Sequence, residues 1–181
     1  TLEKTQEEVF YETEYLQNEG FIPLSAEYKK NNLQEKKTVL FRKLIFDHQK
    51  ILMTDLLEQN SEKIELDSIV FPSESIAIVL MDIDFDEQET AKLKVLIQPK
   101  SIYQISVKKI GEETLETPVG KFLCNKLEIR PDLGVFNYLI GFAIPSIYYW
   151  QRKEIPRIPI QYSGPSEGPW SEHILAKIVK Y

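Results

Sequence analysis

Cysteine and histidine, which build most metal and nucleophilic sites, are scarce in this chain. Its 181 residues include one cysteine, Cys124, and two histidines, His48 and His173. A single cysteine excludes an internal disulfide, so the chain belongs either to a reducing compartment or to an exported domain that is stable without a bridge. A chain of this length buries roughly 70% of its unfolded surface, so a core needs no disulfide.

Catalytic motifs are also missing. The sequence has no Gly-x-Ser-x-Gly turn, no His-x-x-x-His pair and no Cys-x-x-Cys pair. Cys124 falls in the middle of a strand pattern, where a small buried thiol is the usual explanation. We therefore predict a protein that is not an enzyme and needs no cofactor. A hydrolase built on paired carboxylates is a third alternative, because the separation of such a pair is not visible in a sequence.

Positive charge is in deficit. The chain has 22 basic and 28 acidic residues and a net charge of −6, which favours solubility and argues against binding to nucleic-acid phosphates. We predict no nucleic-acid partner. The first residue is Thr1, so we expect a processed or trimmed chain, with a removed signal peptide or lipoprotein leader as one reason and a trimmed disordered tail as the other.

Period-two alternation of apolar and polar residues recurs through most of the length and predicts strands with one buried face. Turn signals suited to antiparallel hairpins lie between the strand patterns. They fall at 18–20, 31–32, 47–50, 111–113 and 164–169. Helical patterns are scarce, and the best is a short one after Pro72 that Ser73 or Ser75 would cap.

The predicted fold is mainly β. We expect one domain over residues 1–181, a curved antiparallel sheet or open β-barrel with one or two short helices, and residues 1–8 as a candidate disordered N-terminal segment. Thr117-Pro118-Val119-Gly120 predicts a tight reversal between strands at 105–115 and 121–129, because Pro118 fixes φ and Gly120 tolerates a positive φ.

Asp82, Asp84 and Asp86 form the sharpest cluster of like charge. In an extended strand they would project from one face, where three carboxylates are weak candidates for a calcium site. An EF-hand loop counted from Asp82 would need glycine at Glu87 and glutamate at Leu93. We therefore expect no metal site here, but a solvated strand face or a turn.

Residues 133–151 carry no charge and are rich in aromatic and aliphatic side chains. Glycine, asparagine, proline and serine interrupt the run, so we predict no transmembrane span. Two interpretations stay open. One is a buried strand, a turn and a second strand. The other is an apolar loop that contacts a ligand, a lipid layer or a protein, with these contact residues: Phe136, Tyr138, Phe142, Tyr148 and Trp150.

Four segments carry a family resemblance. They are Arg42-Lys43-Leu44-Ile45-Phe46-Asp47, Phe71-Pro72-Ser73-Glu74-Ser75-Ile76, Glu116-Thr117-Pro118-Val119-Gly120-Lys121-Phe122, and the aromatic strand and Arg-Ile-Pro ending between Tyr148 and Ile160. In this order and spacing, they resemble a bacterial family of envelope proteins known as domain of unknown function 3108. The resemblance implies a curved antiparallel sheet exported to the periplasm or cell envelope, with no catalytic residues to carry over.

Two functional hypotheses follow. The first is a non-enzymatic envelope protein whose concave β surface binds an apolar small molecule, a lipid or an envelope protein partner through the aromatic residues of the uncharged run. The alternative is a structural or assembly module that pairs through an exposed strand edge, or through the charged face at 82–87.

Overall fold

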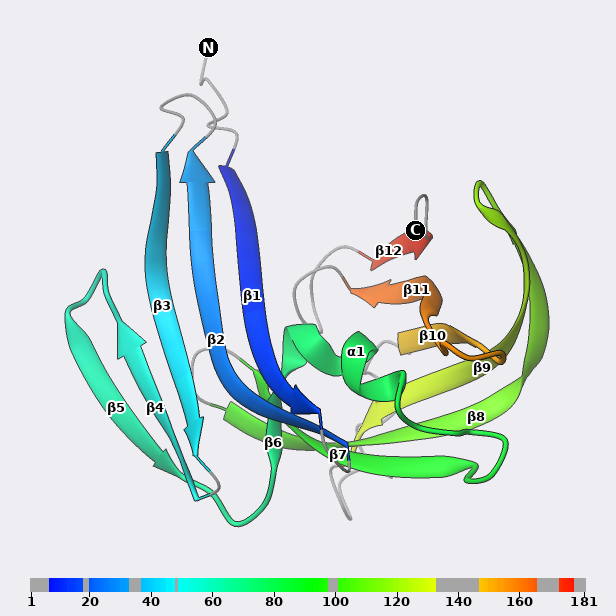
Figure 1. Cartoon of the computed structure of the whole chain (residues 1–181), viewed down its shortest axis with the longest axis horizontal. Coiled ribbons are helices and arrows are strands. Elements are labelled where there is room, and N and C mark those ends of the chain that lie inside the picture. Colours follow the sequence, from blue (N-terminus) through cyan, green and yellow to red (C-terminus); the bar gives the residue numbers. More distant parts are fainter. Residues whose placement is uncertain are drawn as a thin grey trace. The chain divides into compact units, whose positions relative to one another are not determined.

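Figure 1 shows the computed structural model of the chain, which describes residues 7–17, 20–32, 37–47, 49–97, 101–132, 147–165 and 173–177. Strands make up 73% of the structure and helices 6%, so the predicted mainly β class is confirmed. Two compact units, Thr1–Glu74 and Ser75–Tyr181, divide the chain. That residues 1–181 behave as one domain stays a prediction.

The first unit contains a five-stranded antiparallel sheet in the order β1-β2-β3-β4-β5. The strands are β1 (Glu7–Gln17), β2 (Phe21–Asn32), β3 (Lys37–Asp47), β4 (Lys50–Asp55) and β5 (Asn60–Glu65), and the short strand β6 (Val70–Pro72) follows them. Each strand of the sheet pairs with the next one along the chain, and Asp47 stands opposite Lys50. The hairpin predicted at 47–50 is therefore confirmed.

The two faces of this sheet differ in polarity. On one face Ala26, Leu44 and Met53 lie side by side in register and are almost fully buried. On the other face Glu27 bridges two lysines from neighbouring positions, with its carboxylate 3.1 Å from Lys29 Nζ and 2.8 Å from Lys43 Nζ. The period-two pattern of the sequence thus places buried apolar side chains on one face and solvent-accessible ion pairs on the other.

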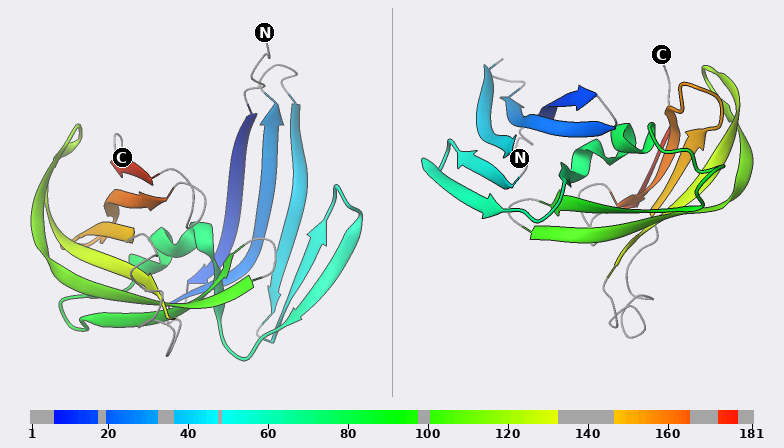
Figure 2. Two further views of the ribbon diagram at one scale, coloured as in Figure 1. Left: turned by 180° about the vertical axis from the view of Figure 1, so that it is seen from behind. Right: turned by 60° about the horizontal axis from the view of Figure 1, so that its bottom comes forward.

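The second unit begins with a short helix and continues as a sheet. The 3₁₀ turn η1 (Ser73–Ser75) leads into α1 (Ile76–Leu80), and the strands are β7 (Thr90–Ile97), β8 (Ser101–Thr117), β9 (Gly120–Pro131), β10 (Ile147–Arg152), β11 (Pro159–Pro165) and β12 (His173–Lys177). Consecutive strands from β7 to β12 pair antiparallel. The sheet curls strongly, and α1 lies on its concave side (Figure 2).

The helix and the turn after it supply the core of this unit. Phe85, from that turn, is completely buried and packs with Val107 of β8 and Leu127 of β9 in one apolar cluster. Leu80 of α1 belongs to the same cluster. The middle of the concave face is therefore filled by the chain's own side chains.

Local predictions for this unit are partly confirmed. Gly120 has a φ of +140° and stands opposite Thr117, so the predicted reversal between β8 and β9 exists. The short helix after Pro72 is also present, with Ser75 at the N-cap position but without a capping hydrogen bond from its side chain. The turn predicted at 111–113 is wrong. Gly111 lies inside β8 at a register shift, because glycine here accommodates a β-bulge and not a chain reversal.

Candidate functional site

The acidic segment at 82–87 forms turns and not a strand, so its three aspartates do not share a strand face. Asp84 Oδ1 accepts a hydrogen bond from the Asp86 backbone N–H at 2.9 Å, and the Asp84 carbonyl oxygen accepts bonds from the backbone N–H groups of Glu87 and Gln88 at 3.3 and 3.0 Å. The strand alternative is therefore wrong, because local side-chain and backbone hydrogen bonds favour turn formation by aspartate.

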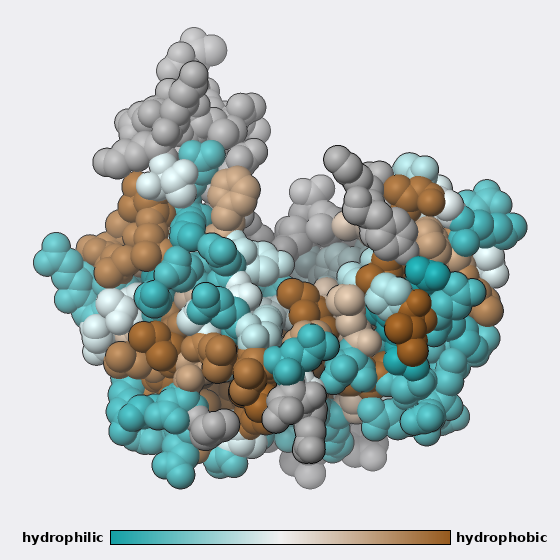
Figure 3. All heavy atoms as spheres, in the orientation of Figure 1, coloured by the Kyte–Doolittle hydropathy of each residue, from teal (hydrophilic) through white to brown (hydrophobic). Residues whose placement is uncertain are grey.

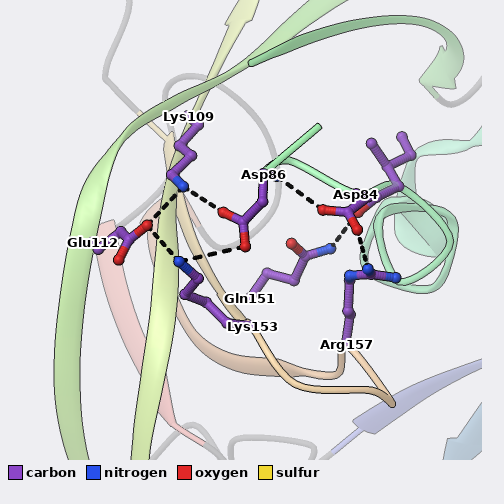
Figure 4. Close-up of polar contacts among 8 residues, drawn as sticks. Asp84, Asp86, Lys109, Glu112, Gln151, Lys153 and Arg157 are labelled. Carbon is purple, nitrogen blue, oxygen red and sulfur yellow. Dashed lines mark hydrogen bonds and ion pairs between the residues drawn. The ribbon is translucent and has the colours of Figure 1, made fainter. Parts of the chain in front are cut away.

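Asp86 belongs to a cluster of four charged side chains (Figure 4). Lys109 Nζ lies 2.5 Å from Asp86 Oδ1 and 2.8 Å from Glu112 Oε1, while Lys153 Nζ lies 2.5 Å from Glu112 Oε1 and 3.4 Å from Asp86 Oδ2. The hydrogen bond from Lys109 is the main cause that lowers the pKa of Asp86, and the bond to Asp86 is the main cause that raises the pKa of Lys109. Two carboxylates and two ammonium groups thus balance each other.

A second set of contacts ties the same turn to β10 and to the segment after it. Arg157 pairs with Asp84 (Figure 4), and Gln151 Nε2 donates to the backbone carbonyl oxygens of Leu80 and Ile83 at 2.5 and 3.0 Å. Gln151 is nearly fully buried. These contacts hold the turn that carries Phe85, so we interpret the polar cluster as structural.

The three aspartates are not arranged as the ligands of one metal ion. Asp84 and Asp86 face cations, and Asp82 is exposed. Across the residues that the structure describes, no three histidine, cysteine, aspartate or glutamate side chains come together as metal ligands would. Carboxylates already paired with lysine and arginine would have to lose those partners in order to bind calcium.

The predicted ligand-contact residues that the structure describes are Tyr148 and Trp150, both on β10. The Trp150 side chain is 5% exposed, and its indole N–H donates to Glu113 Oε2 at 2.8 Å. Lys126 Nζ lies 5.0 Å from the centroid of the Trp150 ring and 5.6 Å from the centroid of the Tyr148 ring. Trp150 therefore packs in a core cluster, together with Leu115, Cys124 and Ile160. A ligand-contact role for these two residues stays a prediction.

Phe136, Tyr138 and Phe142 lie outside the described residues, as does His48. His173 is the first residue of β12. Cys124 is completely buried in β9, as a small core thiol was predicted to be. Burial, with a smaller contribution from Glu113, raises the pKa of this thiol to about 11, so it is protonated at neutral pH and a poor nucleophile.

A hollow lies within the first unit, where β2 begins and β3 ends. This pocket has a volume of about 230 Å³. Its lining is apolar except for Asp47 and Ser68, and comprises Ile22, Pro23, Leu24, Phe46, Asp47, Leu66, Ser68, Ile69 and Val70. Leu24 and Ile69 remain 42% and 47% exposed, so apolar carbon faces solvent at the pocket.

Sequence reasoning did not identify this pocket. The segments that line it are far apart in the sequence. The feature of the sequence that comes closest to predicting the pocket is a loss of apolar–polar alternation in two apolar runs, Phe21-Ile22-Pro23-Leu24 and Ile69-Val70-Phe71. Such a run is ambiguous, because it is equally typical of a strand buried on both faces. Only the folded chain brings the two runs together around one hollow.

Fold and geometry define a mainly β protein with a strongly curled antiparallel sheet, without an assembled metal centre among the described residues. The chain belongs to the family described as protein of unknown function, DUF3108, whose model matches residues 13–165. No curated protein and no solved structure matches the chain. Among the described residues, no helix is long and apolar enough to cross a membrane.

Proposed function

We propose that this protein is a non-enzymatic component of the cell envelope that binds a small apolar ligand in the pocket of its first unit. The observation that carries the proposal is the pocket of about 230 Å³ with its largely apolar lining. The envelope location is supported by the family resemblance of the sequence. The absence of a disulfide is compatible with an exported domain of this size.

The size of the pocket limits the ligand. A protein cavity of roughly 150 Å³ lined by leucine, isoleucine and phenylalanine accommodates benzene. A hollow of about 230 Å³ therefore suits one ring or one short alkyl chain. Each methylene group transferred from water to such a lining contributes about 0.8 kcal/mol, so a six-carbon chain gains roughly 5 kcal/mol, from which the cost of association is subtracted.

Binding is tested with 1-hexanol by titration calorimetry on the purified chain. Leu24→Gln and Ile69→Gln place a polar group at the pocket and are expected to weaken binding roughly tenfold, because burying an amide without a partner costs about 1 to 3 kcal/mol. Leu57→Gln is the matched control, since Leu57 is 67% exposed and does not line the pocket.

Two results would count against the pocket. If the wild-type protein does not bind 1-hexanol at millimolar concentration, the proposed ligand pocket is wrong. Equal loss of binding in Leu57→Gln and in the two pocket variants shows that the alcohol adsorbs to exposed apolar surface in general.

A second candidate function is assembly through a strand edge, as the sequence suggested. β1 is the outermost strand of its sheet, is 11 residues long and contains neither proline nor lysine, the residues that most often protect an edge from pairing. Phe10 and Leu16 are about half exposed. Light scattering after gel filtration tests this function. A Phe10→Lys variant is expected to abolish any dimer of the wild type, and a wild type that is monomeric at high concentration removes self-assembly.

A further inference from the structure

The apolar pocket of the first unit has two polar lining residues, and both present oxygen atoms. Asp47 is the last residue of β3, and Ser68 lies in the segment between β5 and β6. Among the residues that line the pocket, none is basic. The lining side chains therefore carry one negative charge and no positive charge.

The ion pair that Asp47 forms within the protein is weak. Lys50 Nζ lies 3.4 Å from Asp47 Oδ2, and the two side chains are 44% and 54% exposed. An exposed pair of this length contributes little, since water and salt screen it. A cation brought to Asp47 by an apolar tail in the pocket competes with Lys50 at little cost.

Ser68 does not offset this charge. Its hydroxyl donates to Asp67 Oδ1 at 3.1 Å, which directs the proton away and leaves the oxygen lone pairs as acceptors. The segment that carries Ser68 is held close to the β3–β4 turn, because the Leu66 N–H donates to the Gln49 carbonyl at 2.7 Å. This hydrogen bond joins the backbone close to Ser68 to the backbone close to Asp47.

We infer that the ligand of this pocket is a single-chain amphiphile with an apolar tail and a cationic, hydrogen-bond-donating head that pairs with Asp47. The inference rests on the proposed function, because the tail must occupy the pocket. An ammonium head suits the site, since it has three donors and one positive charge. A carboxylate head would place two negative charges side by side and is disfavoured.

Three probes with a six-carbon chain distinguish the contribution of the head group to binding from that of the tail. They are hexylammonium, 1-hexanol and hexanoate, each titrated by calorimetry at low salt. We expect hexylammonium to bind roughly 3 to 10 times more tightly than 1-hexanol, the range of a partly exposed charge pair, and hexanoate to bind most weakly. In 0.5 M NaCl the ratio of the hexylammonium affinity to the 1-hexanol affinity should fall toward one, while the affinity for 1-hexanol itself should not decrease.

Asp47→Asn is expected to remove the preference for hexylammonium and to leave 1-hexanol binding unchanged. Glu58→Gln is the matched control, because it removes one negative charge from the exposed β4–β5 turn, at the opposite end of β4 from Asp47, and should retain the preference. If Asp47→Asn does not fold, the salt dependence of the wild type decides.

The outcomes distinguish the inference from the proposed function. The cationic head is wrong if 1-hexanol binds as tightly as hexylammonium. It is also wrong if the preference for hexylammonium persists in Asp47→Asn or in 0.5 M NaCl. In either case the proposed apolar pocket is not contradicted. Failure of all three probes to bind overturns both.

Discussion

The two units each contain an antiparallel sheet, but they differ in how completely the apolar side chains are buried. In the second unit α1 and the turn after it pack on the curled sheet, and Phe85 and Leu127 are completely buried. Among the described residues, a larger share of the large apolar side chains is exposed in the first unit, as with Phe10, Ile45 and Leu57. Figure 3 shows hydrophobic residues beside hydrophilic ones on one face of the molecule.

This difference suggests a division of roles. A sheet covered by its own helix and turn has its apolar area already buried, and a ligand has little to add there. Exposed apolar carbon next to a pocket is what a ligand or partner would cover. We therefore expect the second unit to depend most on its core and the first unit to carry the binding activity.

The largest effect is expected for Phe85→Ala in the second unit. Phe85 is completely buried, and loss of a core phenylalanine side chain costs about 3 to 5 kcal/mol. Urea unfolding followed by tryptophan fluorescence reports this loss, because both tryptophans, Trp150 and Trp170, belong to the second unit. The exposed control Ile155→Ala should change stability by less than about 0.5 kcal/mol. Equal effects in the two variants would contradict the assigned core.

Leu44→Ala tests the first unit in the same way. Leu44 is completely buried on β3, so the expected cost is about 2 to 5 kcal/mol. Far-UV circular dichroism reports on both units, whereas tryptophan fluorescence reports only on the second. If the units unfold independently, the dichroism midpoint shifts and the fluorescence midpoint does not; a shared shift shows that they unfold together. A variant as stable as the wild type would refute the core role of Leu44.

Gly120→Ala is expected to destabilise the β8–β9 hairpin by about 1 to 3 kcal/mol. The cause is backbone strain at a φ of +140° and not crowding, because an added Cβ would lie 3.6 Å from the nearest atom of Phe122. Gly111→Ala is the matched control in the same hairpin, since nothing lies within 4 Å of its added Cβ. Thermal unfolding of both variants measures the difference, and equal stability would argue against a backbone requirement at Gly120.

The smallest effect is expected for Asp86→Asn. The pKa of Asp86 is lowered in the folded chain, so its ion pairs stabilise the fold above the unfolded pKa, near 3.9, and lose this effect as the pH falls through the folded pKa. Because the Asp86 side chain is 40% exposed, solvent screening limits the loss at pH 7 to about 1 kcal/mol or less.

The pH dependence separates this role from a general loss of charge. Urea unfolding at pH 7 and at pH 3 should show a difference between wild type and Asp86→Asn that shrinks at the lower pH. Asp82→Asn, an exposed residue in the same turn, should match the wild type at both values. A constant difference across this range would exclude the ion pairs as its cause.

Much of the fold was predictable because strand formation follows local rules. Alternation predicted the antiparallel strands, Gly120 predicted the β8–β9 reversal, and Pro72 with the following serines predicted the short helix. The interpretation of Gly111 was wrong, because glycine is compatible with both a turn and a bulge and only the pairing partner decides between them.

The candidate site was much less predictable. At the acidic segment the sequence predicted a solvated strand face or a turn without a metal, but not its ion pairs, whose cations come from β8 and from the chain after β10. For Trp150 the sequence left a buried strand and an apolar contact loop open, and only the structure shows that this residue is 5% exposed. In both cases the decisive neighbours lie far away in sequence, and periodicity carries no signal of them.

By itself, the sequence determined that the chain is a mainly β protein, with a buried thiol at Cys124 and a glycine-dependent hairpin. These properties follow from side-chain alternation and backbone sterics, which act over a few residues. Only the tertiary structure decided which aspartates are neutralised and where Ile22 and Ile69 meet around a pocket. Charge pairing and cavity formation depend on distances between strands, and those distances exist only once the sheets have formed.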